Sequence, residues 1–177
     1  DLKNALRSFD YCGIGEVRCR QIHPKGFMRG IGIAGIYNPF TGEGNVDAAH
    51  DPRNLPFTMA HEMAHGYGFS DEGTCNFFAF IACINSENKY VRYCGWQATL
   101  RYFRAELRDL DPEYYEQFVA RMPTGLKADR RHAMAFHDAY PMWFPEVSQS
   151  INDVYLKTQG VAEGTKSYNR LVSMVAA

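Results

Sequence analysis

The chain has 177 residues, 46% of them hydrophobic and 22% charged, a composition typical of one globular domain and not of a disordered chain. Its formal net charge of −1 and pI near 6.6 argue against nucleic-acid binding by electrostatics. No run approaches the roughly 18 apolar residues that a membrane-spanning helix needs.

The N-terminal stretch indicates a helix already under way, with Leu2, Leu6 and Phe9 on its apolar side. Because the chain starts at Asp1 without a methionine, we expect residues 1–177 to be a single domain taken from a longer protein. Cys12 and Cys19 follow in a glycine-containing loop, where an oxidising compartment would allow them to pair. The other three cysteines fall in predicted helices and are expected to be buried thiols: Cys75, Cys83 and Cys94.

Residues from about Met28 to Ala49 form the one convincing β region. A glycine-rich apolar run at 31–37 leads into turn residues at 38–44, and 45–48 return as a second strand. We expect a hairpin in a small antiparallel sheet that covers the following helix. An edge strand there would also allow an extended peptide to join by main-chain hydrogen bonds, and the glycines would let its backbone come close.

The segment 58–68 contains the pattern His61-Glu62-x-x-His65. On a helix, His61 and His65 stack on one face and can bind a single Zn²⁺ at about 2.0–2.1 Å each. Glu62 lies about 100° further round, where it cannot join the metal but can reach a water as general base. Two histidines half-buried for packing are the structural alternative, but burying them beside a carboxylate is costly unless a cation compensates.

A third zinc ligand is offered by two neighbouring residues, Asp71 and Glu72. Gly68 ends the first helix, and Asp71 then stands where a ligand can follow such a glycine turn directly. Glu72 opens a second helix that runs to about Ile84, with Asn76 one turn along on the same face. Asp71 already has a structural role as helix N-cap, and Asn76 could hydrogen-bond a zinc-bound histidine. This division of labour favours Glu72.

Further helices are predicted at 88–108, 111–122, 127–140 and 165–175, with Pro141 and Pro145 disturbing the chain before 147–157. In the first of these, an apolar stripe is expected to face the core: Tyr93, Trp96, Leu100, Phe103 and Leu107. The four remaining histidines form no second metal motif. One of them, or a tyrosine such as Tyr155 or Tyr168, could stabilise an oxyanion opposite the zinc.

The motif residues resemble a bacterial family of membrane-anchored, zincin-like proteins of unknown function, gluzincin-like in its HExxH…E pattern. Nearly the whole chain takes part in the resemblance, through residues 35–43, 55–65, Gly68-Phe69, Glu72, Asn76-Phe77, 155–157 and Ser167-Tyr168. The resemblance implies that Glu72 is the third ligand, that Asn76 stands where related metallopeptidases have an aspartate, and that Tyr168 is the better tyrosine candidate. Gly73-Thr74-Cys75 departs from the family's Asp-Glu-Ala, so a second acidic residue is missing. The family carries transmembrane helices before this region, which implies a membrane-anchored protein with this domain outside the cytoplasm.

The sequence therefore predicts a mostly helical α+β domain of zincin type. We expect a zinc-dependent peptidase that acts on peptides or proteins, with zinc on His61, His65 and Glu72, Glu62 as general base, and Tyr168 as an assisting residue. The alternative is a catalytically silent, zinc-bound domain that serves as a sensory or scaffolding module of a membrane protein. Glu62 favours chemistry, because a purely structural site would close its fourth position with another protein ligand.

Overall fold

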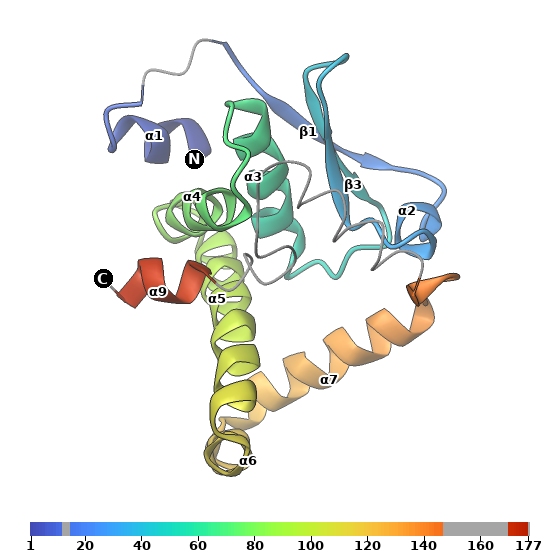
Figure 1. The fold of residues 1–177 in the computed structure, drawn as a ribbon, viewed down its shortest axis with the longest axis vertical. Coiled ribbons are helices and arrows are strands. Elements are labelled where there is room, and N and C mark those ends of the chain that lie inside the picture. The colour runs from blue at the N-terminus through green and yellow to red at the C-terminus, as the bar shows by residue number, and fades with distance from the viewer. Residues whose placement is uncertain (12–14, 147–169, 177) are drawn as a thin grey trace.

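The structure is a computed structural model that describes residues 1–11, 15–146 and 170–176 (Figure 1). Three predictions from the sequence fall outside the described residues: the pairing of Cys12 with Cys19, and the roles of Tyr155 and Tyr168. The helices are α1 (Leu2–Arg7), α2 (Phe27–Gly30), α3 (Leu55–Gly66), α4 (Glu72–Ile84), α5 (Lys89–Leu110), α6 (Pro112–Arg121), α7 (Thr124–Ala139) and α9 (Arg170–Ala176). The strands are β1 (Arg18–Ile22), β2 (Gly35–Asn38) and β3 (Glu43–Asp47). The fold is mostly helical α+β with a small sheet, as predicted.

The sheet is mixed, with the strand order β1-β3-β2. β2 and β3 form the expected antiparallel hairpin, in which Gly35 lies opposite Val46. β1 adds to the other edge of β3 in parallel, with Arg18 opposite Glu43. The expectation of a purely antiparallel sheet is therefore wrong, while β2 does form a sheet edge.

Two local features explain what the sequence pattern does not predict about the sheet. β1 reads Arg-Cys-Arg-Gln-Ile, with a single β-branched residue and only exposed or half-buried side chains, so it lacks the usual strand signal. The first hairpin strand begins at Gly35 and not at Ile31, because the preceding chain turns through α2. The Asp47 carboxylate holds this helical turn by accepting the backbone N–H groups of Gly26 (2.8 Å) and Arg29 (2.9 Å).

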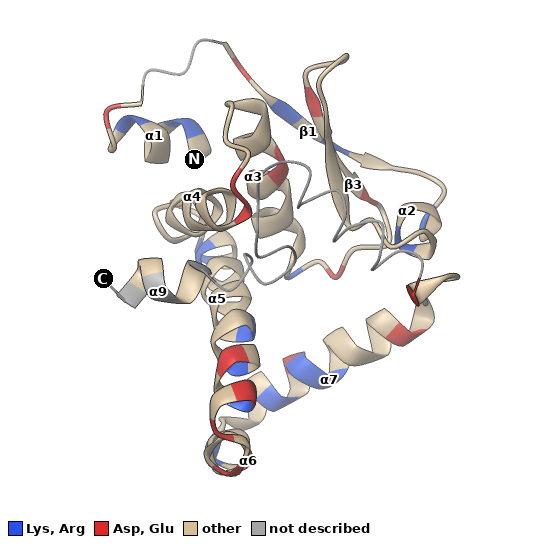
Figure 2. Ribbon diagram, viewed as in Figure 1, with Lys and Arg blue, Asp and Glu red and all other residues tan. Residues whose placement is uncertain are grey.

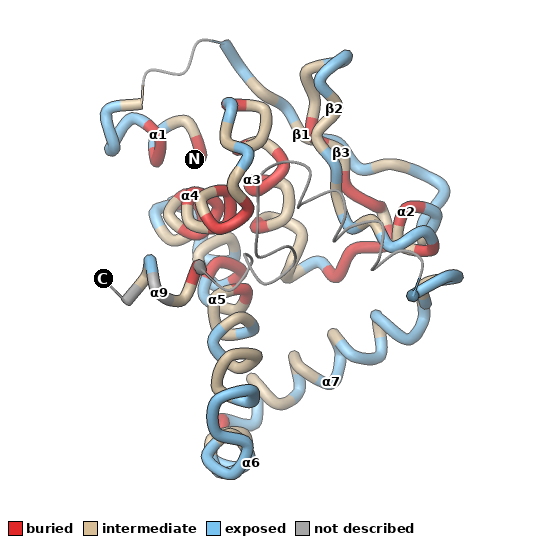
Figure 3. The backbone as a smooth tube through the Cα atoms, viewed as in Figure 1, coloured by how far each residue is buried: buried red, intermediate tan, exposed pale blue. Residues whose placement is uncertain are grey.

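The core lies where α3 and α4 pack on each other. The sheet covers one side of α3, and α4 and α5 lie on the other, so the sheet does cover the HExxH helix as expected (Figure 1). Buried positions gather in α3, α4 and the adjoining part of α5 (Figure 3). Burial of these apolar side chains supplies the main driving force for folding. The largest contributors include Leu2, Leu6, Phe57, Phe78, Phe80 and Leu171.

The buried face of α5 differs from the predicted stripe. Trp96 is 56% exposed and Phe103 40%, whereas Gly95 and Ala98 are buried. Small residues let α5 approach α4 closely: a Cβ built on Gly95 would lie 2.7 Å from the Cβ of Cys83. The large side chains therefore flank the contact instead of filling it, with Trp96 edge-on to Phe80 at 5.1 Å between ring centroids. The periodicity predicts the helix correctly but assigns its core face wrongly.

Beyond α5 the chain turns through α6 and returns as α7 at an open angle to α5 (Figure 1). Asp111 caps α6 by accepting the Tyr114 N–H at 2.9 Å, and Pro112 occupies the first turn, where it is tolerated. α7 has no buried residue along its described length. None of the helices in the described ranges combines the length and apolarity needed to cross a bilayer.

Candidate metal centre

The turn between α3 and α4 brings the predicted ligands together. α3 begins at Leu55 with Pro56 in its first turn and ends at Gly66, and Gly68 adopts a φ of +98°, which favours glycine. α4 then starts at Glu72, with Asp71 as N-cap accepting the backbone N–H of Thr74 at 2.8 Å. This sharp reversal places the first turn of α4 over the last turns of α3.

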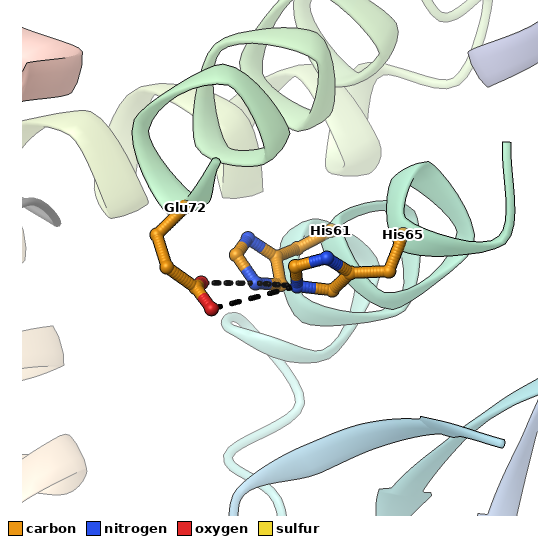
Figure 4. A group of neighbouring side chains, drawn as sticks. All are labelled: His61, His65 and Glu72. Atoms are coloured by element: carbon orange, nitrogen blue, oxygen red, sulfur yellow. Dashed lines mark hydrogen bonds and ion pairs between the residues drawn. The ribbon is translucent and has the colours of Figure 1, made fainter. Parts of the chain in front are cut away.

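His61, His65 and Glu72 converge on one point (Figure 4). The Nε2 atom of His61 lies 3.0 Å from Oε2 of Glu72, and Nε2 of His65 lies 3.7 Å from Oε1. The two Nε2 atoms are 3.1 Å apart. The atoms that could ligate a metal all lie within 4.8 Å of one another. Small movements of these side chains would thus place all three around one ion.

The other nitrogen of each histidine faces an oxygen acceptor. His61 Nδ1 lies 2.9 Å from the side-chain oxygen of Asn76, and His65 Nδ1 lies 2.8 Å from the backbone oxygen of Phe69. A carbonyl oxygen can only accept, so both Nδ1 atoms carry the proton. In a neutral imidazole this leaves each Nε2 with a free lone pair, the form that binds a metal. The approach of Asn76 to the ring nitrogen of His61 matches the prediction.

The charges in this cluster favour a shared positive charge, either a proton or a metal ion. Burial disfavours ionisation of Glu72, but the two imidazoles outweigh it and lower the pKa of the carboxyl to about 2. Burial also opposes a charge on His65, yet Cys75 and Glu72 raise the pKa of its imidazole to about 11. Oε2 of Glu72 is buried without hydrogen-bond geometry to a described group. Without a metal, the cluster therefore holds a proton between the Glu72 carboxylate and the histidines. A divalent cation can replace that proton, and two nitrogens with one oxygen are a donor set that zinc uses.

Glu62 lies beside this group, against the sheet. Its side chain is 6% exposed and sits between α3 and the glycines of the hairpin. A Cβ on Gly35 would lie 2.8 Å from Cδ of Glu62, and a Cβ on Gly44 would lie 2.9 Å from its Cβ. We expected the glycines to admit a substrate backbone, whereas in the structure the space beside these two is taken by Glu62.

The surroundings of Glu62 shift the pKa of its carboxyl upward. Burial raises the pKa of its carboxyl, the imidazoles of His61 and His65 lower it, and Glu72 raises it, with a net increase above the ordinary value. Cys19, on β1, is close enough that the carboxylate adds to burial in raising the pKa of its thiol to about 12. Glu62 is therefore a buried carboxyl with a perturbed pKa next to a candidate metal centre, an arrangement found at many catalytic sites.

The structure separates the two candidate third ligands. Glu72 faces the histidines, while Asp71 accepts hydrogen bonds from the N–H and the hydroxyl of Thr74, both at 2.8 Å. Tyr168, the predicted assisting residue, lies outside the described residues. Two further neighbours of His65 are not evident from the sequence: the Phe69 carbonyl and Cys75, whose sulfur lies 3.4 Å from Nδ1 of His65. A backbone carbonyl leaves no sequence signal, and a buried thiol resembles any small core residue.

Known proteins include a family that this chain matches over nearly its whole length. A profile described as "Protein of unknown function (DUF3810)" matches residues 1–176. No curated protein and no solved structure matches the chain.

Proposed function

Since the chain belongs to the family described as "Protein of unknown function (DUF3810)", we propose its function from the candidate metal centre: a zinc-dependent peptidase of gluzincin type. The observation that carries the proposal is the convergence of His61, His65 and Glu72 on one point. The Nδ1 atoms of the two histidines are hydrogen-bonded elsewhere, to the side chain of Asn76 and the backbone oxygen of Phe69. This arrangement supports metal binding through both Nε2 atoms and the Glu72 carboxylate.

His61, His65 and Glu72 would hold the ion, each from a rigid helical segment. When bound, Zn²⁺ supplies a Lewis acid that polarises a carbonyl group and makes water acidic near neutral pH. Within the described residues this group contains three protein ligands. A purely structural zinc site typically has four, so the count favours an open coordination position over a closed one.

Glu62 would act as the general base. It lies next to the histidines but outside the group of candidate ligands. The pKa of its carboxyl is raised, and so lies closer to neutral pH than that of an ordinary glutamate. The carboxylate would take a proton from the attacking water and deliver it to the amine that leaves. Gly35 and Gly44 give this side chain its room, because any larger residue would occupy the same space.

A peptide is the substrate class that the surroundings support best. β2 forms an edge of the sheet next to α3, so its outward backbone groups are placed to pair with an extended chain. Ile36 on this strand is 48% exposed, which would give such a peptide an apolar contact.

Metal analysis followed by a peptide-library cleavage assay tests the proposal. We expect about one zinc per chain, lost in His61→Ala and retained in His137→Ala, which removes an exposed histidine of α7. Glu62→Gln should keep zinc and lose hydrolysis, since an amide cannot accept the proton. A protein that takes up no zinc, or a Glu62→Gln variant as active as wild type, would contradict the proposal. Zinc binding without cleavage of any peptide would instead favour a silent sensory or scaffolding domain.

A further inference from the structure

A second candidate site lies between α5 and α7, away from the metal centre. Where the two helices diverge from α6, their facing sides enclose a cavity of about 490 Å³, within the range of small-molecule sites. The lining positions of α5 follow a helical period and form one face: Gln97, Arg101, Arg104, Ala105 and Arg108. The metal-centre residues His61, Glu62, His65 and Glu72 are not among those that line it.

The cavity is strongly basic. Among the described residues, its lining includes six arginines and three aspartates but no lysine: Arg29, Arg53, Arg101, Arg104, Arg108, Arg130, Asp51, Asp129 and Asp138. Figure 2 shows basic positions on α5 and on the first half of α7 where the two helices face each other. The charges therefore come from separate elements that the fold brings to one place.

The aspartates do not neutralise this charge. Arg53 alone binds two of them, with N···O distances of 2.8 Å to Asp51 and 2.5 Å to Asp129. Within the described part of the chain, no carboxylate forms an ion pair with four of the other arginines: Arg29, Arg101, Arg104 and Arg130.

Repulsion between these guanidinium groups is not relieved by an anion among the described residues, because the partners found are neutral: Arg130 donates to the Tyr115 hydroxyl at 3.4 Å, and Arg101 lies over the Tyr102 ring at 5.0 Å. Burial lowers the pKa of Arg104, and the like charges of Arg130 and Arg101 lower it further. The Nε atom of Arg29 is buried and has no hydrogen-bond partner among the described residues. Leaving such groups together costs free energy that a bound anion would offset.

We propose that this cavity binds a phosphate-bearing ligand with an apolar portion. A guanidinium presents a planar fork of N–H donors that matches phosphate oxygens, which explains why arginine and not lysine lines the site. Met134 and Phe136 of α7 add apolar surface beside the arginines. A phospholipid headgroup and a free phosphate ester share this chemistry.

Binding of two probes distinguishes these sources: pyrophosphate in solution, and vesicles of phosphatidylglycerol compared with phosphatidylcholine. We expect saturable binding that Arg104→Gln and Arg130→Gln each weaken by about tenfold or more. Arg131→Gln is the matched control, because it removes the same charge from a neighbouring, exposed position of α7 that does not line the cavity. It should change the affinity by less than about twofold.

Binding to phosphatidylglycerol vesicles alone would identify a lipid headgroup, and binding to pyrophosphate alone a free phosphate. The proposal is overturned if neither probe binds, or if Arg131→Gln weakens binding as much as Arg130→Gln does. Circular dichroism of each variant checks folding, and Arg101→Gln replaces Arg104→Gln if the latter unfolds. Zinc content should stay unchanged in all of them, so this inference stands or falls separately from the proposed peptidase activity.

Discussion

Replacing Gly35 with alanine should remove hydrolysis while leaving stability and zinc content nearly unchanged. The new Cβ would lie 2.8 Å from both Cγ and Cδ of Glu62, closer than non-bonded carbon atoms approach. The carboxylate is the flexible end of the Glu62 side chain, so it would rotate away from the position in which it is proposed to accept a proton from water. Alanine in a strand is favoured over glycine by roughly 0.5–1 kcal/mol, which offsets the strain of this movement.

The expected loss follows from the role of the displaced group. A positioned general base contributes typically 10²–10⁴-fold to the rate, so Gly35→Ala should reduce kcat/KM by about a hundredfold or more. Gly44→Ala should behave differently, because its Cβ would lie 2.9 Å from Cβ of Glu62, which is fixed to α3. There the sheet must move, and overpacking of this kind costs about 1–3 kcal/mol.

Three measurements decide the outcome: hydrolysis of a peptide from the library, zinc content, and thermal unfolding. Gly125→Ala is the control, since a Cβ at this position of α7 meets nothing within 4 Å. It should match wild type in all three. If Gly35→Ala hydrolyses the peptide at the wild-type rate with zinc bound, the Glu62 carboxylate does not act as general base from the position described.

Further predictions concern the ligands, their support and one remote histidine. Glu72→Ala should weaken zinc binding by more than about 100-fold, whereas Asp71→Ala should keep zinc and cost about 0.5–2 kcal/mol of unfolding free energy; equal losses of zinc, measured by competition with a chelator, would contradict the assignment. Asn76→Leu, which removes the acceptor for His61 Nδ1, should weaken zinc about 10–100-fold, and Asn76→Asp should restore it; no difference between the two would contradict the tautomer argument. Burial and, next, the charges of Arg29 and Arg101 lower the pKa of His50 from 6.5 to about 4. Between pH 6.5 and pH 4 the imidazole is therefore protonated in the unfolded chain but not in the folded one, so the free energy of unfolding falls as the pH falls. Metal-free wild type should therefore lose on the order of 3 kcal/mol more than His50→Gln between pH 7 and pH 4 in urea unfolding, and parallel profiles would refute this.

The helices and the convergence of His61, His65 and Glu72 could be read from the sequence because their signals are local. The His61–His65 spacing, the glycine at 68 and the cap at Asp71 all act within one or two turns of helix, where periodicity and capping rules apply. The same holds for Asn76, one turn beyond Glu72. Each of these predictions depends on neighbours in the chain and not on the packing of distant elements.

Features that depend on packing between elements far apart in the chain could not be predicted from the sequence in this way. β1 is defined by a parallel ladder to β3, and its own residues have weak strand preference. The core face of α5 is set by the close approach of Gly95 to Cys83. The basic cavity combines arginines from α2, the loop before α3, α5 and α7. Their local excess of positive charge is not visible in the net charge of the whole chain, which is near zero.

The turn that joins α3 to α4 also has a consequence for the order of folding. His61, His65 and Glu72 come from one short segment, so closing the loop between them costs little chain entropy. The hairpin that confines Glu62 comes from an earlier part of the chain and must dock across a longer separation, which is the slower kind of contact to form. The ion-holding half of the centre can thus assemble before the base is in place, and pulsed hydrogen exchange should protect α3 and α4 before β3. Under the proposed function, a nascent chain would then bind its metal before it could hydrolyse neighbouring chains.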